Sequence, residues 1–392
     1  MRLPAWALVM IAIVRAQAPP AITAEAHLKQ AAAYRDKGDS QRAVAELRRA
    51  LALKPDLQDA HGMWGEILLS QGFAQEAVPH LERAGHVHSL AVGLMELNRL
   101  PEALHQLVAL YRRQSNDLEL LFHLGEASGE LMQETFDRLI RTHPDSPRAR
   151  ELRARSGLGQ TRRSLVEPEK LDELLTEYVQ HPGDPEALFQ LGEASQRVMQ
   201  GAFDALLRLH PNSARALEFQ ARSYLGQSRS DVAEPLFRSA LNLNPGLPGV
   251  HLALGRILSE ERGNLDGGEQ EFRAEVRLRP GDSQAAWRLG AVLLKKGQTA
   301  EALAELQRSD KLKPNMLETL LELGKVYLME NQLEEAEKVY RHMIDIEDAD
   351  ELAAAAHWQL SQIYRKMDKP AEAEQHLKRV RELNSPKKPN VQ

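Results

Sequence analysis

Cysteine is absent from the 392 residues of the chain, and several other features are scarce. Without cysteine there can be no disulfide, no thiolate nucleophile, no thiolate metal ligand and no lipidated N-terminal cysteine. Aromatic residues make up only 5%, and 50 Lys and Arg against 56 Asp and Glu give a net charge of −6, with the two signs interspersed. Nucleic-acid binding therefore has no electrostatic basis. The fold has to be stabilised by packing alone.

A long apolar run stands at the N-terminus, from Leu3 to Val14, directly after Arg2. Ala16-Gln17-Ala18 follows it with the small-x-small pattern of a cleavage site. Residues 1–18 are therefore predicted to be a signal peptide, which places the mature protein in the periplasm or cell envelope, or outside the cell. The run is short for a membrane span, so none is expected after cleavage. An uncleaved anchor is the alternative, because Arg15 lies close to the cleavage site.

The composition favours helix. Hydrophobic residues make up 43% and charged residues 27%, with many Ala, Leu, Glu and Arg. From Ala24 onward one pattern returns at close to 34 residues, which points to a repeat architecture. Two copies show it well: segment 214–247 carries Leu217, Ala221, Tyr224, Ala233, Phe237, Ala240 and Pro245, and segment 283–316 carries Leu289, Gly290, Gly297, Ala302, Leu306 and Pro314.

These positions resemble the tetratricopeptide repeat, a pair of helices with Leu-Gly in the first helix, Ala in the second and Pro at the end. The resemblance implies an all-α, right-handed superhelical solenoid of stacked antiparallel helix pairs. It also implies a concave groove, lined by the first helices, that binds a protein or peptide. No catalytic residue, cofactor or metal ion is implied, and self-association stays open.

The repeats are expected in three blocks after the signal peptide, residues 19–117, 118–247 and 248–384, with a capping helix at the end of the third. The polar, proline-containing tail 385–392 is predicted to be disordered.

The middle block contains an internal duplication. Residues 121–160 match 188–227 at an offset of 67, with about 25 of 40 positions identical. In both copies, 19 residues separate the first-helix glycine from the closing proline (Gly125 to Pro144, Gly192 to Pro211), against 24 in Gly290 to Pro314. The connection between the two helices is therefore shortened, or one helix is clipped. The duplication is also expected to create two equivalent ligand-binding positions, unless it is only a recent copy.

Four aromatic residues are predicted to anchor the partner, because each lies two residues before the Leu of its first helix. At about 100° per residue, that position falls beside the core-facing stripe, at the edge of the groove. The alternative is that these side chains pack against the next first helix. Acidic residues flank two of them, and basic residues were expected toward the C-terminal half. The predicted groove residues are Phe122, Glu126, Phe189, Glu193, Arg222, Arg256, Trp287, Lys325, Trp358 and Arg365.

Three histidines near the end of the second repeat, His80, His86 and His88, were considered as a metal site. Their spacing is not the i, i+4 spacing of helical ligands, so surface histidines are the expected interpretation. The sequence as a whole predicts a non-catalytic scaffold or adaptor of the cell envelope. The competing hypothesis is a carbohydrate-binding or glycan-processing accessory module, because exposed aromatics near Glu and Arg also suit sugars.

Overall fold

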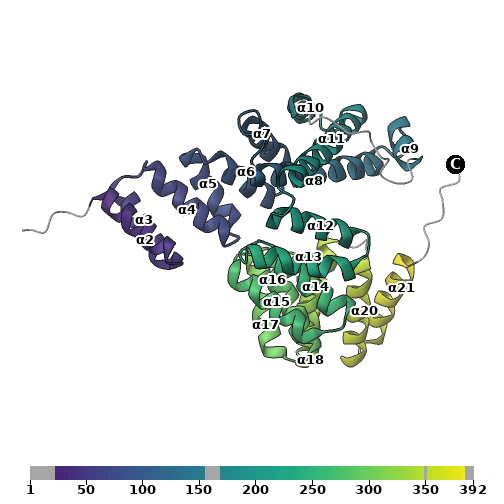
Figure 1. Ribbon diagram of the computed structural model, residues 1–392. Coiled ribbons are helices and arrows are strands. Elements are labelled where there is room, and N and C mark those ends of the chain that lie inside the picture. Colours follow the sequence, from purple (N-terminus) through teal and green to yellow (C-terminus); the bar gives the residue numbers. More distant parts are fainter. Residues whose placement is uncertain (1–22, 155–167, 348–350, 385–392) are drawn as a thin grey trace, which may run out of the picture. The chain divides into compact units, whose positions relative to one another are not determined.

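The computed structural model describes residues 23–154, 168–347 and 351–384, and every regular element in these ranges is a helix (Figure 1). The predicted signal peptide and tail lie outside the described residues. The helices fall into two compact units, which divide at 210/211, except that Ser70–Gly72 is grouped with the second unit. The all-α fold of stacked helix pairs predicted from the sequence is confirmed. The division into three blocks stays a prediction.

Unit 1 contains ten helices in its described part. They are α2 (Ala24–Asp36), α3 (Ser40–Leu53), α4 (Gln58–Ser70), α5 (Ala74–Ala84), α6 (Val87–Glu96), α7 (Leu100–Tyr111), α8 (Leu118–Thr142), α9 (Pro147–Ala154), α10 (Pro168–Gln180) and α11 (Pro185–Leu209). The start of α10 at Pro168 agrees with the sequence, since proline favours the first turn of a helix.

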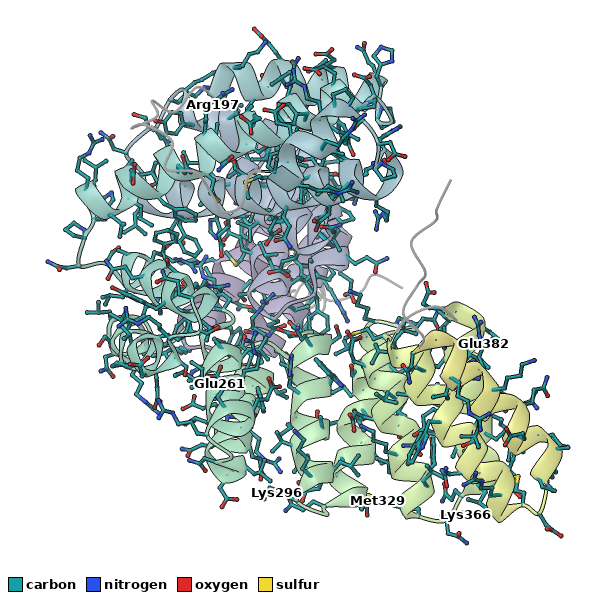
Figure 2. All side chains as sticks on the ribbon, turned by 90° about the vertical axis from the view of Figure 1, so that its right-hand side faces the viewer. Arg197, Glu261, Lys296, Met329, Lys366 and Glu382 are labelled. Carbon is teal, nitrogen blue, oxygen red and sulfur yellow. The ribbon has the colours of Figure 1, made fainter. Side chains whose placement is uncertain are left out.

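Unit 2 is a regular stack of antiparallel pairs. Its elements are α12 (Ala214–Gly226), α13 (Ser230–Leu243), α14 (Val250–Arg256), the π-helix η1 (Ile257–Glu261), α15 (Leu265–Leu278), α16 (Ser283–Lys295), α17 (Thr299–Leu312), α18 (Leu317–Met329), α19 (Leu333–Ile346), α20 (Glu351–Lys366) and α21 (Pro370–Leu383). Lys296, Met329 and Lys366 lie at or just beyond the ends of successive first helices, and they line up along one edge of this unit (Figure 2).

Glycine allows the two helices of a regular repeat to approach closely. A Cβ added at Gly65, Gly290 or Gly324 would collide with the side chain that lies 16 residues later, on the second helix (65→81, 290→306, 324→340). The chain reverses between the helices at a residue with positive φ, such as Gly297 (φ 76°) or Asn331 (φ 58°). Each pair is thus fixed by one close contact and one tight turn.

The two duplicated segments do not reverse. Each forms a single continuous helix of 25 residues, α8 and α11. Asp117 and Asp184 cap the two N-termini, by accepting hydrogen bonds from the amides of Leu120 (2.9 Å) and Ala187 (2.8 Å). The predicted shortening is therefore a complete loss of the turn, and the two helices of each repeat have merged.

The merged helices pack on each other in an antiparallel and reciprocal way. A Cβ at Gly125 in α8 would collide with Phe203 of α11, and a Cβ at Gly192 in α11 would collide with Phe136 of α8. Because 136 and 203 are equivalent positions, the second half of each helix occupies the place that a second helix takes in a regular repeat. The two repeats have exchanged their second halves within one chain, as a shortened hinge favours in domain swapping.

Hydrogen bonds around the exchanged pair repeat the same symmetry. His143 Nε2 lies 2.9 Å from the Gly183 carbonyl oxygen, and the equivalent His210 Nε2 lies 2.9 Å from the Asn116 carbonyl oxygen. The symmetry extends to α7 and α10, where Leu104, Leu107 and Tyr111 correspond to Leu171, Leu174 and Tyr178. The duplicated unit is therefore longer than the segment that the sequence comparison identified.

A polar pair joins the two helices in four repeats. In each, a histidine four residues before the residue at the helix crossing contacts an acid or a second histidine on the second helix. The pairs are His27 with Glu46 (2.6 Å), His61 with His80 (2.7 Å), His251 with Glu271 (2.7 Å) and His357 with His376 (2.7 Å).

Candidate partner-binding surface

Two of the four predicted aromatic anchors are core residues. Phe122 is 1% exposed and Phe189 is 6% exposed, both within the exchanged pair of unit 1. The Phe122 ring lies 6.4 Å from that of Phe203, and Phe189 lies 6.4 Å from Phe136. The prediction that they form an exposed groove edge is wrong, because the exchanged second halves cover them. Phe122 and Phe189 do occupy equivalent positions, but what they share is their packing in the core.

The other two predicted anchors lie in unit 2, at equivalent positions of α16 and α20. Trp287 is partly buried against the core, and the Arg288 guanidinium lies 4.2 Å from its ring centroid. Trp358 is 48% exposed. Trp287 is thus partly covered and Trp358 is exposed, and a role of either side chain in partner binding stays a prediction.

Two leucines occupy the same position on two other first helices of unit 2, one before α16 and one between α16 and α20. Leu252 of α14 and Leu321 of α18 lie two residues before the Leu of their first helices and are partly buried. Neither leucine is aromatic, so neither stands out among the predicted anchors, although both show the Leu-x-Leu spacing in the sequence. Contacts join α16 to α18 and α18 to α20. We call Leu252, Trp287, Leu321 and Trp358 the first-helix row.

The predicted basic stretch beside this row is largely paired. Lys325 Nζ lies 2.7 Å from Glu322, Arg222 lies 2.8 Å from Glu218, and Arg256 lies 3.9 Å from Glu260. Glu218 is fully buried, so its contact with Arg222 belongs to the interior of the repeat. These cations therefore contribute little free charge to the surface.

Free positive charge is found at the end of α20. Arg365 and Lys366 are exposed, and no carboxylate of the described residues lies within ion-pair distance of either. Cations in the last turn of a helix also interact favourably with the helix dipole. The exposed end of the first-helix row therefore combines one indole ring with two unpaired cations.

The predicted acidic positions, Glu126 and Glu193, are half-buried on α8 and α11. They lie in unit 1, whereas the first-helix row belongs to unit 2. The ten predicted groove residues thus divide between the units, and only the six on α12 to α20 share one stack of first helices.

The histidines near the second repeat bind different partners. His80 contacts His61, His86 Nδ1 lies 2.9 Å from Glu66, and His88 Nε2 lies 3.1 Å from His123. Within the described residues there is no group of three or more His, Asp or Glu side chains that could hold a metal ion. None of the described helices has the length and apolar character needed to cross a membrane.

Comparison with known proteins identifies the repeats directly. Three family models described as tetratricopeptide repeat match the chain, one at residues 24–85, 200–248 and 252–316, another at 293–357 and a third at 354–386. Cellulose synthase operon protein C of Pseudomonas fluorescens (strain SBW25) is 31% identical over 135 residues, which are 32% of this chain and 10% of that protein. The chain thus spans about a tenth of the length of this relative.

Three solved structures that match part of the chain can be compared with it. A MamA fragment of Desulfovibrio magneticus RS-1 is 23% identical and covers 43% of this chain and 94% of its own, with a TM-score of 0.40. PilW, described as a type IV pilus biogenesis factor, is 19% identical with coverages of 56% and 94% and a TM-score of 0.43. PilF of Pseudomonas aeruginosa is 18% identical with coverages of 56% and 92% and a TM-score of 0.42.

The family models together cover more than half of the chain, and the helix pairs, crossing glycines and turns of unit 2 agree with them. This chain belongs to the tetratricopeptide repeat family.

Proposed function

We propose that the chain is a scaffold that holds a segment of a partner protein against the first-helix row of unit 2. The observation that carries this proposal is Trp358, a large aromatic side chain that is 48% exposed at the end of an apolar row. Tryptophan is frequent among the residues that dominate interface energies. The role requires no chemistry from the chain itself.

The neighbouring charges define the kind of segment that fits. Leu321 and Trp358 offer apolar contact, while Arg365 and Lys366 supply unpaired positive charge on the same helix as Trp358. A segment with apolar side chains followed by acidic groups would satisfy both features. Its direction along the row would be set by charge, because complementary charges orient a ligand more than they add affinity.

We also propose that the protein acts in the periplasm or cell envelope. The supporting feature is the N-terminal sequence, with Arg2 before the apolar run and a small-x-small site at Ala16-Gln17-Ala18. N-terminal sequencing of the mature protein should begin after Ala18. Recovery of the full-length chain with Met1 from the cytoplasm would refute export.

The binding proposal can be tested with Trp358→Ala. Once a partner has been recovered by cross-linking in the native cell, its affinity for this variant should fall about 30-fold, which corresponds to about 2 kcal/mol for an anchor residue. The thermal stability should barely change, because the indole is not part of the core. Met329→Ala is the matched control, since Met329 is also apolar and 57% exposed but lies outside the row.

A carbohydrate ligand is the second candidate, because the relative of 31% identity is named as a cellulose synthase operon protein and an exposed indole also stacks on sugar rings. A glycan array with the wild-type protein and Trp358→Ala separates the two readings. Binding of glycans that depends on Trp358, without any protein partner, would replace the scaffold proposal.

A further inference from the structure

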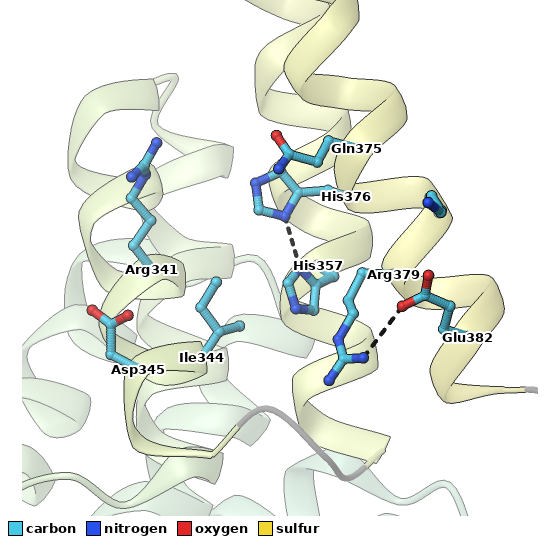
Figure 3. A pocket seen from close by; sticks show the side chains of 9 residues that line it. Arg341, Ile344, Asp345, His357, Gln375, His376, Arg379 and Glu382 are labelled. Carbon is cyan, nitrogen blue, oxygen red and sulfur yellow. Dashed lines mark hydrogen bonds and ion pairs between the residues drawn. The ribbon is translucent and has the colours of Figure 1, made fainter. Parts of the chain in front are cut away.

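A cavity lies between the last two repeats, on the side of their second helices. It has a volume of about 530 Å³ and lies between α19 and α21, with His357 of α20 among its lining residues. Figure 3 shows Arg341, Ile344 and Asp345 on the α19 side. Gln375, His376, Arg379 and Glu382 stand opposite on α21. Trp358 is not among the lining residues, so the cavity is separate from the first-helix row.

The last repeat, α20 and α21, differs from the repeat before it in the length of its first helix and in two residues between its helices. Its first helix has 16 residues, whereas α16 and α18 have 13 each. At the two positions that face each other between the helices, it has His357 and His376 where the preceding repeat has Leu320 and Val339. Two polar rings thus take the place of two aliphatic side chains, and the cavity gains hydrogen-bonding walls.

Among the described lining residues, positive charges outnumber negative ones. Arg341, Lys378 and Arg379 face two acids, Asp345 and Glu382, which gives 3 − 2 = +1 with both histidines neutral. The whole chain, by contrast, has a net charge of −6. The Nδ1 atoms of His357 and His376 are 2.7 Å apart, so one ring must donate and the other accept, and the pair adds no charge in that state.

The cations differ in how strongly they are held. Arg341 is engaged by the Tyr364 hydroxyl at 2.6 Å and by Glu337 at 2.9 Å. Arg379 lies 3.3 Å from Glu382 in an exposed pair, which costs little to break. Lys378 is exposed, and none of the described carboxylates lies within ion-pair distance of it. An incoming carboxylate could therefore recruit Lys378 directly and Arg379 by exchange with Glu382.

We propose that this cavity is a second binding site, which takes an acidic side chain presented by a peptide or protein. Its volume is that of a small-ligand site and accommodates one or two side chains. Lys378 and Arg379 supply the charge that pairs with the carboxylate, and Gln375 and the imidazoles supply further hydrogen bonds. The C-terminal repeat would then hold a partner at two places, one on each side of the repeat.

The test uses a defined probe, the blocked tripeptide acetyl-Glu-Glu-Glu-amide, with acetyl-Gln-Gln-Gln-amide as the neutral control. Binding to the full-length protein is measured by calorimetry at low salt. The wild type should bind the acidic peptide and not the neutral one. The double charge reversal Lys378→Glu/Arg379→Glu should raise the Kd at least tenfold. Lys311→Glu is the matched control, because it reverses an exposed lysine on the second helix α17, outside both the cavity and the first-helix row, and should leave the Kd within about twofold.

Equal binding of the two peptides by the wild type, or an unchanged Kd in the double variant, would overturn the proposal. Circular dichroism melting of each variant checks that the repeat is folded, and neither exposed substitution should lower the melting temperature substantially. Trp358→Ala should retain binding of the acidic peptide. The result therefore distinguishes a failure of the proposal for the first-helix row from a failure of the proposal for this cavity.

Discussion

At the scale of single residues, two equivalent serines occupy an unfavourable position. Ser128 and Ser195 are fully buried in α8 and α11, and their hydroxyls have no hydrogen-bond partner among the described residues. Burial of an unpaired hydroxyl costs about 1–3 kcal/mol, and alanine has the better helix propensity. Ser128→Ala and Ser195→Ala should therefore each raise the free energy of unfolding, by about 1 kcal/mol.

Ser309→Ala is the control for this prediction. Ser309 is equally buried, but its hydroxyl bonds to the Ser283 carbonyl oxygen and to Thr319 Oγ1, both at 2.9 Å. Urea unfolding should show a loss of stability for this variant and a gain for the other two. A comparable loss in all three would mean that the hydroxyls in the long helices are hydrogen-bonded after all.

His80 gives a pH prediction. Burial lowers its pKa below the ordinary value of 6.5, and the neighbouring His61 and Arg83 lower it further. Below pH 6.5 the unfolded chain takes up a proton that the folded chain accepts only at lower pH, so the free energy of unfolding falls as the pH drops. His80→Gln should flatten this dependence between pH 7 and about pH 5 in urea titrations. His181→Gln is the control, because it replaces an exposed histidine and should leave the dependence of the free energy of unfolding on pH as in the wild type. The same dependence in the wild type, His80→Gln and His181→Gln would contradict the prediction.

The first-helix row could be predicted from the sequence only in part. Trp287 and Trp358 follow the same rule, two residues before the Leu, and the rule also finds Leu252 and Leu321. It fails at Phe122 and Phe189 because it assumes that each first helix packs only on its own second helix. In the exchanged pair the covering side chains come from the other long helix, 81 residues along the chain for Phe122 (122→203) and 53 for Phe189 (136→189), which no local pattern can indicate.

At the scale of elements, the exchange of α8 and α11 depends on two glycines. A Cβ at Gly125 or Gly192 would collide with an aromatic ring of the opposite helix. Gly125→Ala and Gly192→Ala should each reduce the free energy of unfolding by about 1–3 kcal/mol through overpacking. The two losses should be similar, because the contacts are equivalent.

Gly226→Ala is the control, since a Cβ at Gly226 meets no atom within 4 Å and the residue is helical. It should be neutral or slightly stabilising in the same unfolding experiment. If Gly192→Ala behaved like Gly226→Ala, the close packing of the two long helices would be refuted.

The repeated helix pairs could be predicted from the sequence, and so could the start of α10 at Pro168. The five-residue deficit in the duplicated segments (24 − 19) was visible as well. The merging of the two helices could not be predicted from this deficit. A short connection is compatible with a tight turn, a clipped helix or a merged helix. The merged form requires a partner of complementary shape, and that partner is the other copy, which supplies Phe136 for Gly192 and Phe203 for Gly125.

At the scale of the whole molecule, the division at 210/211 predicts an independent folding unit. The core of unit 2 is formed by residues from α12 to α21, and repeat arrays are stabilised by contacts between neighbours. A fragment 211–392 should therefore be helical by circular dichroism and should melt cooperatively. A fragment that lacks a melting transition would show that unit 2 depends on unit 1 for its fold.

Binding by the first-helix row of unit 2 is the central claim, and site-specific photo-cross-linking in the native cell tests it most directly. A benzophenone amino acid is placed at Trp358, at Arg365, or at Lys338, which is exposed on the second helix α19. Positions 358 and 365 should each give one discrete protein adduct, and the 365 adduct should be lost when Trp358→Ala is added. Adducts from position 338 alone, or a 365 adduct unaffected by Trp358→Ala, would contradict it.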